Sequence, residues 1–344
     1  MCEYDKDYAR KYIEGTLHAP YTIYKNEVIA DVSKNLGLQS VYDLGGNVSG
    51  VMNIEGSLRY QLSQRGIKYV GVDLSSVYFQ RSFALSLGQT KEETFETVDG
   101  VVGDIRRLPI KSESLETVAC ADVIEHINHP EVALQEMHRV LKHHGKAIVV
   151  VPSLYKLDAI RVPHILQKRF STHENRLLIS EWVSLLSDAG FSVNTKSSRP
   201  LGIASGLLYL SWLNPDCVPT KSCAEDDEEF SSKALEFCEV KKIVAKADRE
   251  IDNLVLRTGH GIQASRKMFE QGDILGLLKL VEHWYNETNK EPNETLHNFI
   301  ESFDVGSVSL AGMDQLQSVM KGSSEAVQDD AFFGNSALLI LEKV

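Results

Sequence analysis

The sequence lacks the features that mark secreted, membrane-spanning and zinc-bound proteins. Its five cysteines include no C-x-x-C pair, so neither a disulfide framework nor a zinc site is indicated. The longest apolar run, Leu201–Leu213, is interrupted by glycines and serines and is too short to span a bilayer. The charged opening residues, MCEYDKDYAR, do not resemble a secretory signal. We therefore expect a cytoplasmic protein without a membrane partner.

An excess of positive charge is also missing. The chain has 36 Lys and Arg residues against 48 Asp and Glu residues, which gives a formal net charge of −12. This balance repels a phosphate backbone, and no local run of basic residues offsets it. We therefore expect no nucleic-acid partner. The apolar fraction of 43% over 344 residues is ordinary for a globular protein with a sizeable core.

What the sequence does have is a regular alternation of short apolar runs and amphipathic segments. The expected strands are Ser40–Leu44, Tyr69–Asp73, Gly100–Gly103, Thr117–Asp122, Ala147–Pro152 and Phe191–Ser197. The expected helices between them are Gly56–Arg65, Val77–Leu87, Pro130–Leu141 and Ser180–Ala189, after a helical segment within residues 1–38. Apolar strands alternating with helices predict an α/β fold with a doubly wound, mostly parallel sheet.

Acidic residues and glycines gather where these strands end. Asp43 closes the first strand and is followed by Gly45 and Gly46, which let a backbone approach a ligand closely. Asp73, at the end of the second strand, can accept both hydroxyls of a ribose. A tight turn explains the glycines equally well, and a helix N-cap explains Asp73. No G-x-G-x-x-G follows the first strand, so a dinucleotide-binding dehydrogenase is disfavoured.

The run DVIEHINHPEVALQEMHRVLKHHGKAIVVVPS resembles the fourth-strand region of class I S-adenosylmethionine-dependent methyltransferases that act on small molecules. GVDLS and GDIRRLPI resemble the second and third strand ends of the same family, at suitable spacing. The resemblance covers about residues 38–197 and the last strand. It implies an enzyme that uses S-adenosylmethionine as cofactor and methylates an oxygen or nitrogen of a small molecule.

The resemblance also implies which residues contact the cofactor, nearly all of them at strand ends. They are Asp43 near the methionine ammonium, Gly45, Gly46 and Gly56 in the cofactor loop, Asp73 at the ribose, Leu74 against the adenine, Asp104 and Ile105 around the adenine ring, and Ala121 and Asp122 beside the sulfonium. The loop departs from the family pattern D-x-G-x-G-x-G, because Asn47 and Ser49 replace later glycines. An insertion over Asn47–Glu55 would restore the spacing and make Gly56 the last glycine.

Two histidines are candidate catalytic residues. His173 falls between the fifth strand and the next helix, where the family lines its substrate pocket, and histidine takes a proton readily near neutral pH. Anchoring of the loop is the alternative role. His126 follows Glu125 and lies near His129, a spacing that also suits a metal ion, although the family uses its Glu-His pair for packing near the cofactor. We expect no metal.

The C-terminal third has a different pattern. Residues 201–330 are mainly helical, whereas Ser336–Glu342 is an apolar strand that resembles the family's last strand. The resemblance implies seven strands, with the last one antiparallel beside Phe191–Ser197. We therefore expect residues 1–200 and 331–344 to form the methyltransferase domain and residues 201–330 to form a helical insertion. Such an insertion would cap the site, select the substrate or form a homodimer contact.

Two alternatives to a small-molecule methyltransferase remain. A non-catalytic interaction protein of the same fold would explain the altered cofactor loop. A methyltransferase acting on a protein or a nucleic acid would share the cofactor residues, but the negative charge disfavours nucleic acid. No N/D-P-P-Y/F motif follows the fourth strand, which disfavours methylation of adenine or of a glutamine amide.

Overall fold

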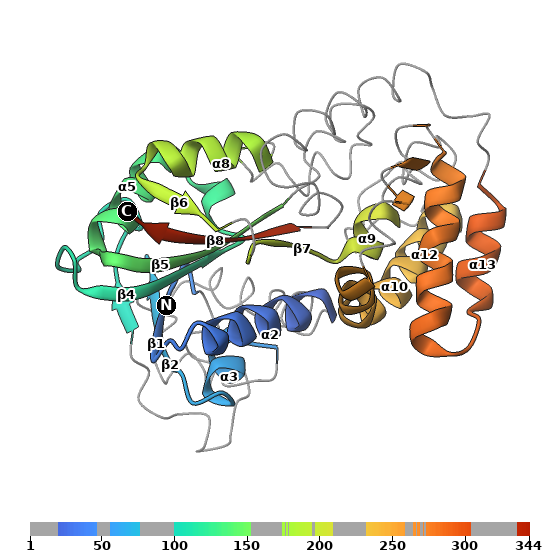
Figure 1. The fold of residues 1–344 in the computed structure, drawn as a ribbon, viewed down its shortest axis with the longest axis horizontal. Coiled ribbons are helices and arrows are strands. Elements are labelled where there is room, and N and C mark those ends of the chain that lie inside the picture. Colours follow the sequence, from blue (N-terminus) through green and yellow to red (C-terminus); the bar gives the residue numbers. More distant parts are fainter. Residues whose placement is uncertain are drawn as a thin grey trace. The chain divides into compact units, whose positions relative to one another are not determined.

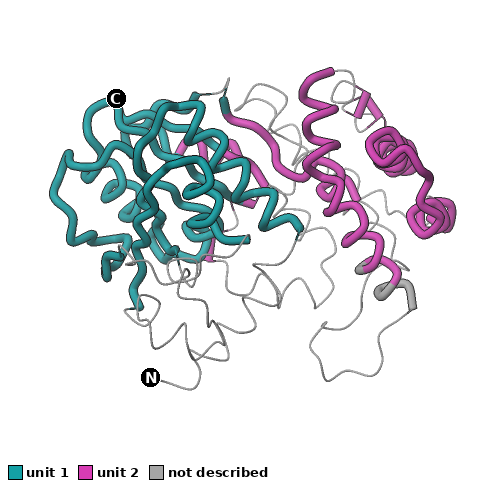
Figure 2. The backbone as a smooth tube through the Cα atoms, turned by 90° about the horizontal axis from the view of Figure 1, so that it is seen from below, with its two compact units in different colours: residues 1–151, 185–197, 339–344 teal, residues 152–184, 198–338 magenta. Residues whose placement is uncertain are grey.

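The computed structural model describes residues 20–46, 56–75, 100–152, 174–175, 177, 179–194, 197–208, 232–258, 264–265, 267–268, 271, 273–303 and 336–344. The chain divides into two compact units, shown in Figure 2. Unit 1 comprises residues 1–151, 185–197 and 339–344, and unit 2 comprises residues 152–184 and 198–338. The expected helix Val77–Leu87, the expected loop insertion Asn47–Glu55 and His173 lie outside the described residues.

A mixed sheet runs through the described chain (Figure 1). Its strands are β1 (Ser40–Leu44), β2 (Lys68–Asp73), β3 (Gly100–Val102), β4 (Leu115–Ala121), β5 (Leu141–Pro152), β6 (Phe191–Val193), β7 (Arg199–Leu201) and β8 (Ser336–Lys343). They are ordered β3-β2-β1-β4-β5-β8-β6, and β7 also pairs with β8. Strands β1 to β5 are parallel, whereas β8 is antiparallel to β6 and β7. The predicted fold class is confirmed.

The central strands are apolar on both faces because helices cover both faces. In β4, Val118, Ala119 and Cys120 are all fully buried, as are most residues of β5 from Ala147 onward. Helices α2 (Pro20–Asn35) and α3 (Leu58–Ser63) lie together on one side, and α5 (Pro130–Val140) lies on the other (Figure 1). The continuous apolar runs seen in the sequence are therefore those of a parallel sheet covered on both faces.

The last strand is buried along nearly its whole length. Its end pairs with β6 in the register Phe191 to Lys343, and its start pairs with β7. Lys343 donates a hydrogen bond to the carbonyl of Leu141 at 2.9 Å, and His144 contacts Glu342 at 2.7 Å between Nδ1 and Oε1. The expected strand at 336–342 and its antiparallel partner are confirmed. The partner ends at Val193, so it is shorter than predicted.

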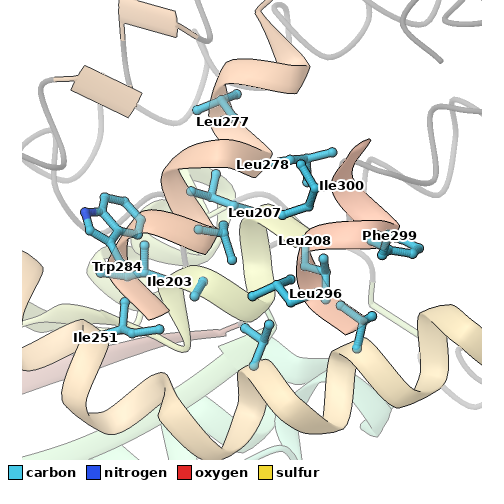
Figure 3. Packing of buried hydrophobic residues seen from close by; sticks show 14 of the residues in the cluster. Ile203, Leu207, Leu208, Ile251, Leu277, Leu278, Trp284, Leu296, Phe299 and Ile300 are labelled. Atoms are coloured by element: carbon cyan, nitrogen blue, oxygen red, sulfur yellow. The ribbon is translucent and has the colours of Figure 1, made fainter. Parts of the chain in front are cut away.

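Between β7 and β8 the described chain is helical. Helices α9 (Ile203–Leu208), α10 (Ser232–Thr258), α12 (Ile274–Asn289) and α13 (Glu294–Glu301) follow one another, and α8 (Ile179–Asp188) precedes β6. Figure 3 shows aliphatic and aromatic side chains of α9, α10, α12 and α13 meeting in one apolar cluster. Among the described residues, none of the helices combines the length and apolar composition needed to cross a membrane.

Two buried aspartates of α10 bind the first turn of α9. Asp252 accepts hydrogen bonds from the backbone amides of Gly202 at 2.7 Å and Ile203 at 2.8 Å. Asp248, one turn earlier, accepts from the amide of Ser205 at 3.1 Å and from its hydroxyl at 2.5 Å. Amides at a helix start have no partner within the helix, so these carboxylates satisfy donors that burial would otherwise leave unpaired. The pair joins α9 to α10.

The pair predicts how stability depends on pH. Burial, together with the charge of Asp252, raises the pKa of Asp248 to about 8. The folded protein therefore keeps a proton that the unfolded chain releases, so the free energy of unfolding should fall as pH rises from about 4 to about 8. Asp248→Asn should flatten this dependence in thermal melts, and Asp273→Asn, at the exposed N-cap of α12, should leave it unchanged. An equally steep fall in Asp248→Asn would contradict the assignment.

The last strand predicts the outcome of a truncation. Removing residues 336–344 deletes four fully or almost fully buried aliphatic side chains, Leu338 to Leu341, and exposes the apolar surface that they cover. Each contributes about 1.5–3 kcal/mol, which together rivals the total stability of about 5–15 kcal/mol of a typical domain. The truncated protein should be insoluble or lose its cooperative melt, whereas removal of the exposed Val344 alone should have little effect. A soluble truncated chain with an unchanged melting temperature would show that β8 is dispensable.

Candidate functional site

The strand register brings the predicted residues to one edge of the sheet. Asp43 pairs with Gly71 on β2 and with Ala119 on β4. Continuing both ladders by two residues places Gly45 level with Asp73 and with Ala121, and Asp73 pairs with Val102 on β3. Because these strands are parallel, their carboxyl ends share this edge, where ligands bind in open α/β sheets.

The two glycines after β1 are held close to their neighbours. Both amides donate to the carbonyl of Val72, at 2.8 Å from Gly45 and 3.2 Å from Gly46. Gly45 has φ +80°, and a Cβ there would lie 2.5 Å from the Val123 side chain. A Cβ on Gly46 would lie 2.4 Å from the Tyr69 hydroxyl. Neither position tolerates a side chain, so the chain after β1 packs directly against the chain after β4.

The ends of β2 and β3 present carboxylates beside exposed apolar side chains. Oδ1 of Asp73 accepts from the amide of Ser75 at 2.9 Å, which fixes the carboxylate. Leu74 is 67% exposed and Val102, on the neighbouring strand, is 50% exposed. These are large apolar side chains at a sheet edge that is otherwise well packed. Val102 is the register partner of Asp73, so exposed apolar surface lies beside this carboxylate.

Asp104 and Ile105 follow β3, and the structure separates their environments. Ile105 is buried, at 7% exposure. Asp104 forms an ion pair with Arg106 at 2.7 Å, and this hydrogen-bonded pairing lowers the pKa of the carboxyl. Any adenine amine that bound Asp104 would therefore share the carboxylate with Arg106.

Helix α2 contributes two adjacent polar side chains to this edge. Lys25 forms an ion pair with Asp122, which follows β4 and has φ +54°. Asn26 donates from Nδ2 to the carbonyl of Gly56 at 2.8 Å. One turn of α2 therefore binds both Asp122, which follows β4, and Gly56, which leads into α3.

Asp43 is buried at 7% exposure, and Tyr69 supplies a hydrogen bond to it. The Tyr69 hydroxyl donates to Oδ2 of Asp43 at 3.0 Å. Burial raises the pKa of Asp43 to about 7, although the Tyr69 hydrogen bond and the charge of Lys25 both lower it. Asp43 is therefore poised between its neutral and charged forms near neutral pH.

Glu125 lies in the single turn η5 (Ile124–His126) after β4 and is almost fully buried, at 1% exposure. Burial and the charge of Asp122 raise the pKa of Glu125 to about 8. His126 Nε2 lies 3.9 Å from Glu125 Oε1 and is partly exposed. Of the two candidate catalytic histidines, only His126 belongs to the described residues, and it lies beside Glu125. Among the described residues, no three His, Cys, Asp or Glu side chains are arranged so that they could hold a metal ion.

Lys25, Asn26 and Tyr69 also lie at this edge, although no sequence pattern predicted them. A signal for Lys25 exists, because it lies four residues before Ile29 on the apolar face of α2 and is itself buried. A lysine at a core position of a helix period is rare without a partner. Its partner, Asp122, is 97 residues away and could not be identified from spacing.

The Asp43–Tyr69 contact predicts a pH-dependent effect of mutation. Tyr69→Phe removes the donor to Asp43, and an unpaired buried acceptor costs about 1–3 kcal/mol. The ionised form of Asp43 depends most on this donor, and Asp43 is ionised above its pKa of about 7. The loss of stability should therefore be larger at pH 9 than at pH 5. Tyr60→Phe, on the partly exposed part of α3, serves as control. Equal losses at both pH values in chemical denaturation would show that Asp43 does not depend on this hydroxyl.

Comparison with known proteins gives one family match. Residues 54–149 match the family described as a methyltransferase domain. A 37.1 kDa uncharacterized protein of transposon TN4556 from Streptomyces fradiae is 26% identical over 164 residues, which is 46% of this chain and 44% of that protein. An uncharacterized protein of Methanocaldococcus jannaschii is 43% identical over 51 residues, 15% of this chain and 22% of that protein. The alignments thus span less than half of either relative.

Solved structures give weaker likenesses. A SAM-dependent methyltransferase from Thermotoga maritima is 22% identical, covers 57% of this chain and 80% of its own, and has a TM-score of 0.38. The YcgJ protein from Bacillus subtilis is 20% identical, with 49% and 69% coverage and a TM-score of 0.38. Scores this low carry no argument about activity. Residues 54–149 are thus similar to a methyltransferase domain, and they include strands β2, β3 and β4 of the observed sheet.

Proposed function

We propose that this protein transfers the methyl group of S-adenosylmethionine to an oxygen or nitrogen of a small molecule. The observation that carries the proposal is the convergence of Asp43, Asp73 and Asp122 on one sheet edge, within or beside the segment that matches the methyltransferase family. The choice of a small-molecule acceptor rests on the resemblance of the run DVIEHINHPEVALQEMHRVLKHHGKAIVVVPS to small-molecule methyltransferases.

The residues at this edge suit the cofactor. S-adenosylmethionine carries a positive sulfonium and a positive ammonium, and Asp43 and Asp122 provide carboxyl groups for them. Asp73 would hold the ribose, while Leu74 and Val102 provide exposed apolar surface for the adenine. The two glycine amides already bind Val72, so the methionine carboxylate must find other donors.

The protein's contribution to the chemistry is mainly placement. When bound, the cofactor supplies an activated methyl group, so orienting the acceptor in line with it does most of the work. A base is needed only if the acceptor must lose a proton. We propose His126 and His173 for that role, His126 because it borders the cluster beside Asp122. The alternative is an interaction protein of the same fold that does not catalyse methyl transfer. If such a protein has no working cofactor site, a titration with S-adenosylmethionine shows no binding and so distinguishes it from the enzyme.

The ribose assignment gives a direct test. Asp73→Ala should weaken binding of S-adenosylmethionine by about tenfold to a hundredfold, because hydrogen bonds to a charged group contribute about 1.5–3 kcal/mol. Calorimetric titration measures this, with Asp188→Ala at the exposed end of α8 as a control for the substitution. A folded Asp73→Ala protein with the affinity of the unmodified protein would remove Asp73 from the site. Absence of binding in the unmodified protein would argue against methyl transfer itself.

A further inference from the structure

Three carboxyl groups share one lysine at the edge of the sheet. Asp122 forms an ion pair with Lys25, and the charge of Lys25 also acts on Asp43 and Glu125. The side chain of Lys25 is only 8% exposed, and Asp43 and Glu125 are more deeply enclosed than Asp122. If all four groups were ionised, negative charge would exceed positive charge in a place with little water.

Among the described residues, no lysine or arginine other than Lys25 acts on Asp43, Glu125 or the neighbouring Cys120. Asp43 also faces the Tyr69 hydroxyl and the charge of Asp73, both on β2. Burial, and then the charges of all three carboxyls, hold the pKa of the Cys120 thiol on β4 well above its usual range, so the thiol stays neutral. Two further described groups, Arg59 and His126, are positively charged or become so when protonated. Arg59 of α3 acts on Tyr69, and His126 lies 3.9 Å from Glu125.

Resting on the methyl-transfer function proposed above, we propose that the cationic cofactor completes this cluster. Its binding expels protons from Asp43 and Glu125, and the site therefore distinguishes S-adenosylmethionine from its product by charge. During transfer the bond between sulfur and the methyl carbon breaks, its electron pair stays on sulfur, and the methyl carbon bonds to the acceptor. The sulfonium becomes a neutral thioether, so the product has one positive charge fewer to offer the carboxyls.

The direction of the effect follows from electrostatics. A positive charge within about 4–6 Å favours an ionised carboxyl and lowers its pKa by about 1–3. The pKa of Asp43 is raised to about 7 and that of Glu125 to about 8, so both hold protons to a substantial degree at neutral pH. A fall of that size ionises them. After methyl transfer the protons return, and the carboxyls no longer attract the product as strongly.

Proton exchange can be counted directly. Binding of S-adenosylmethionine and of S-adenosylhomocysteine should be measured at pH 7 in two buffers of different ionisation enthalpy. The sulfonium makes the α-amino group of S-adenosylmethionine more acidic than that of S-adenosylhomocysteine. Each free ligand is therefore titrated separately, and the proton exchange of its own α-amino group is subtracted before the two ligands are compared. We expect S-adenosylmethionine to release more protons, by on the order of one. Its affinity relative to the product should rise between pH 6 and pH 8, by up to about tenfold per pH unit for each extra proton released.

Matched variants separate the cluster from the rest of the protein. Glu125→Gln keeps the shape of the side chain but cannot titrate, so it should reduce the difference in proton release. Glu116→Gln makes the same change at the exposed opposite end of β4 and should leave the difference intact. If Glu125→Gln does not fold, the measurement on the unmodified protein decides alone.

The outcomes distinguish the two proposals. If S-adenosylmethionine binds but both ligands exchange protons equally and show the same pH dependence, charge discrimination is wrong while methyl transfer stands. If Glu125→Gln binds and leaves the difference unchanged, Glu125 is not the titrating group and the cluster as proposed is wrong. If the unmodified protein binds S-adenosylmethionine at no pH, the proposed function itself fails.

Discussion

Parallel pairing of β3, β2, β1 and β4 is the constraint on which the candidate site depends. Parallel strands end on the same side of the sheet, so residues that follow four separate apolar runs meet at one edge. Asp43, Asp73 and Asp122 are distant in sequence, yet the register puts each of them on this edge or next to it. No single segment forms the site, and a slip of one strand would remove its carboxylate from the others.

Buried carboxyl groups must be satisfied by hydrogen-bond donors or by opposite charge. The protein uses two different solutions in its two units. In unit 2, Asp248 and Asp252 receive hydrogen bonds from the amides at the start of α9 and from the Ser205 hydroxyl. These neutral donors belong to the fold itself, which indicates a structural role. In unit 1, Asp43 and Glu125 instead share the charge of Lys25 with Asp122, and their pKa values are raised, as is that of Asp248 in unit 2.

Much of the fold could be predicted because it is encoded locally. The runs that form β1, β2, β4 and the second half of β5 are largely apolar, and β8 is a continuous apolar segment. Strand β7 was missed because it is three residues long and contains Pro200. Strand β5 begins at Leu141, earlier than expected, because α5 passes directly into it without a loop.

The site was predictable only in part, because a sequence pattern shows which residues end a strand but not which partners other elements supply to them. Acidic residues and glycines at strand ends can be recognised in a sequence, and the register brings those on β1, β2 and β4 together. Partners supplied by other elements cannot be recognised in this way, because Lys25 lies 97 residues from Asp122 and Tyr69 lies 26 residues from Asp43. The local pair of Asp104 and Arg106 is two residues apart, but nothing in the sequence indicates that Arg106 folds back onto the carboxylate.

Helix α2 then acquires a role that its position before the first strand does not suggest. Its consecutive residues Lys25 and Asn26 hold the residue after β4 and the glycine before α3. Asp122 has a left-handed backbone, φ +54°, which costs free energy for a residue other than glycine unless its surroundings impose it. The ion pair with Lys25 is one contact that holds this backbone conformation. The charge of Lys25 also lowers the pKa values of Asp43 and Glu125. A displacement of α2 would therefore alter the backbone and the protonation of the edge together, so this helix belongs to the site as much as the strands do.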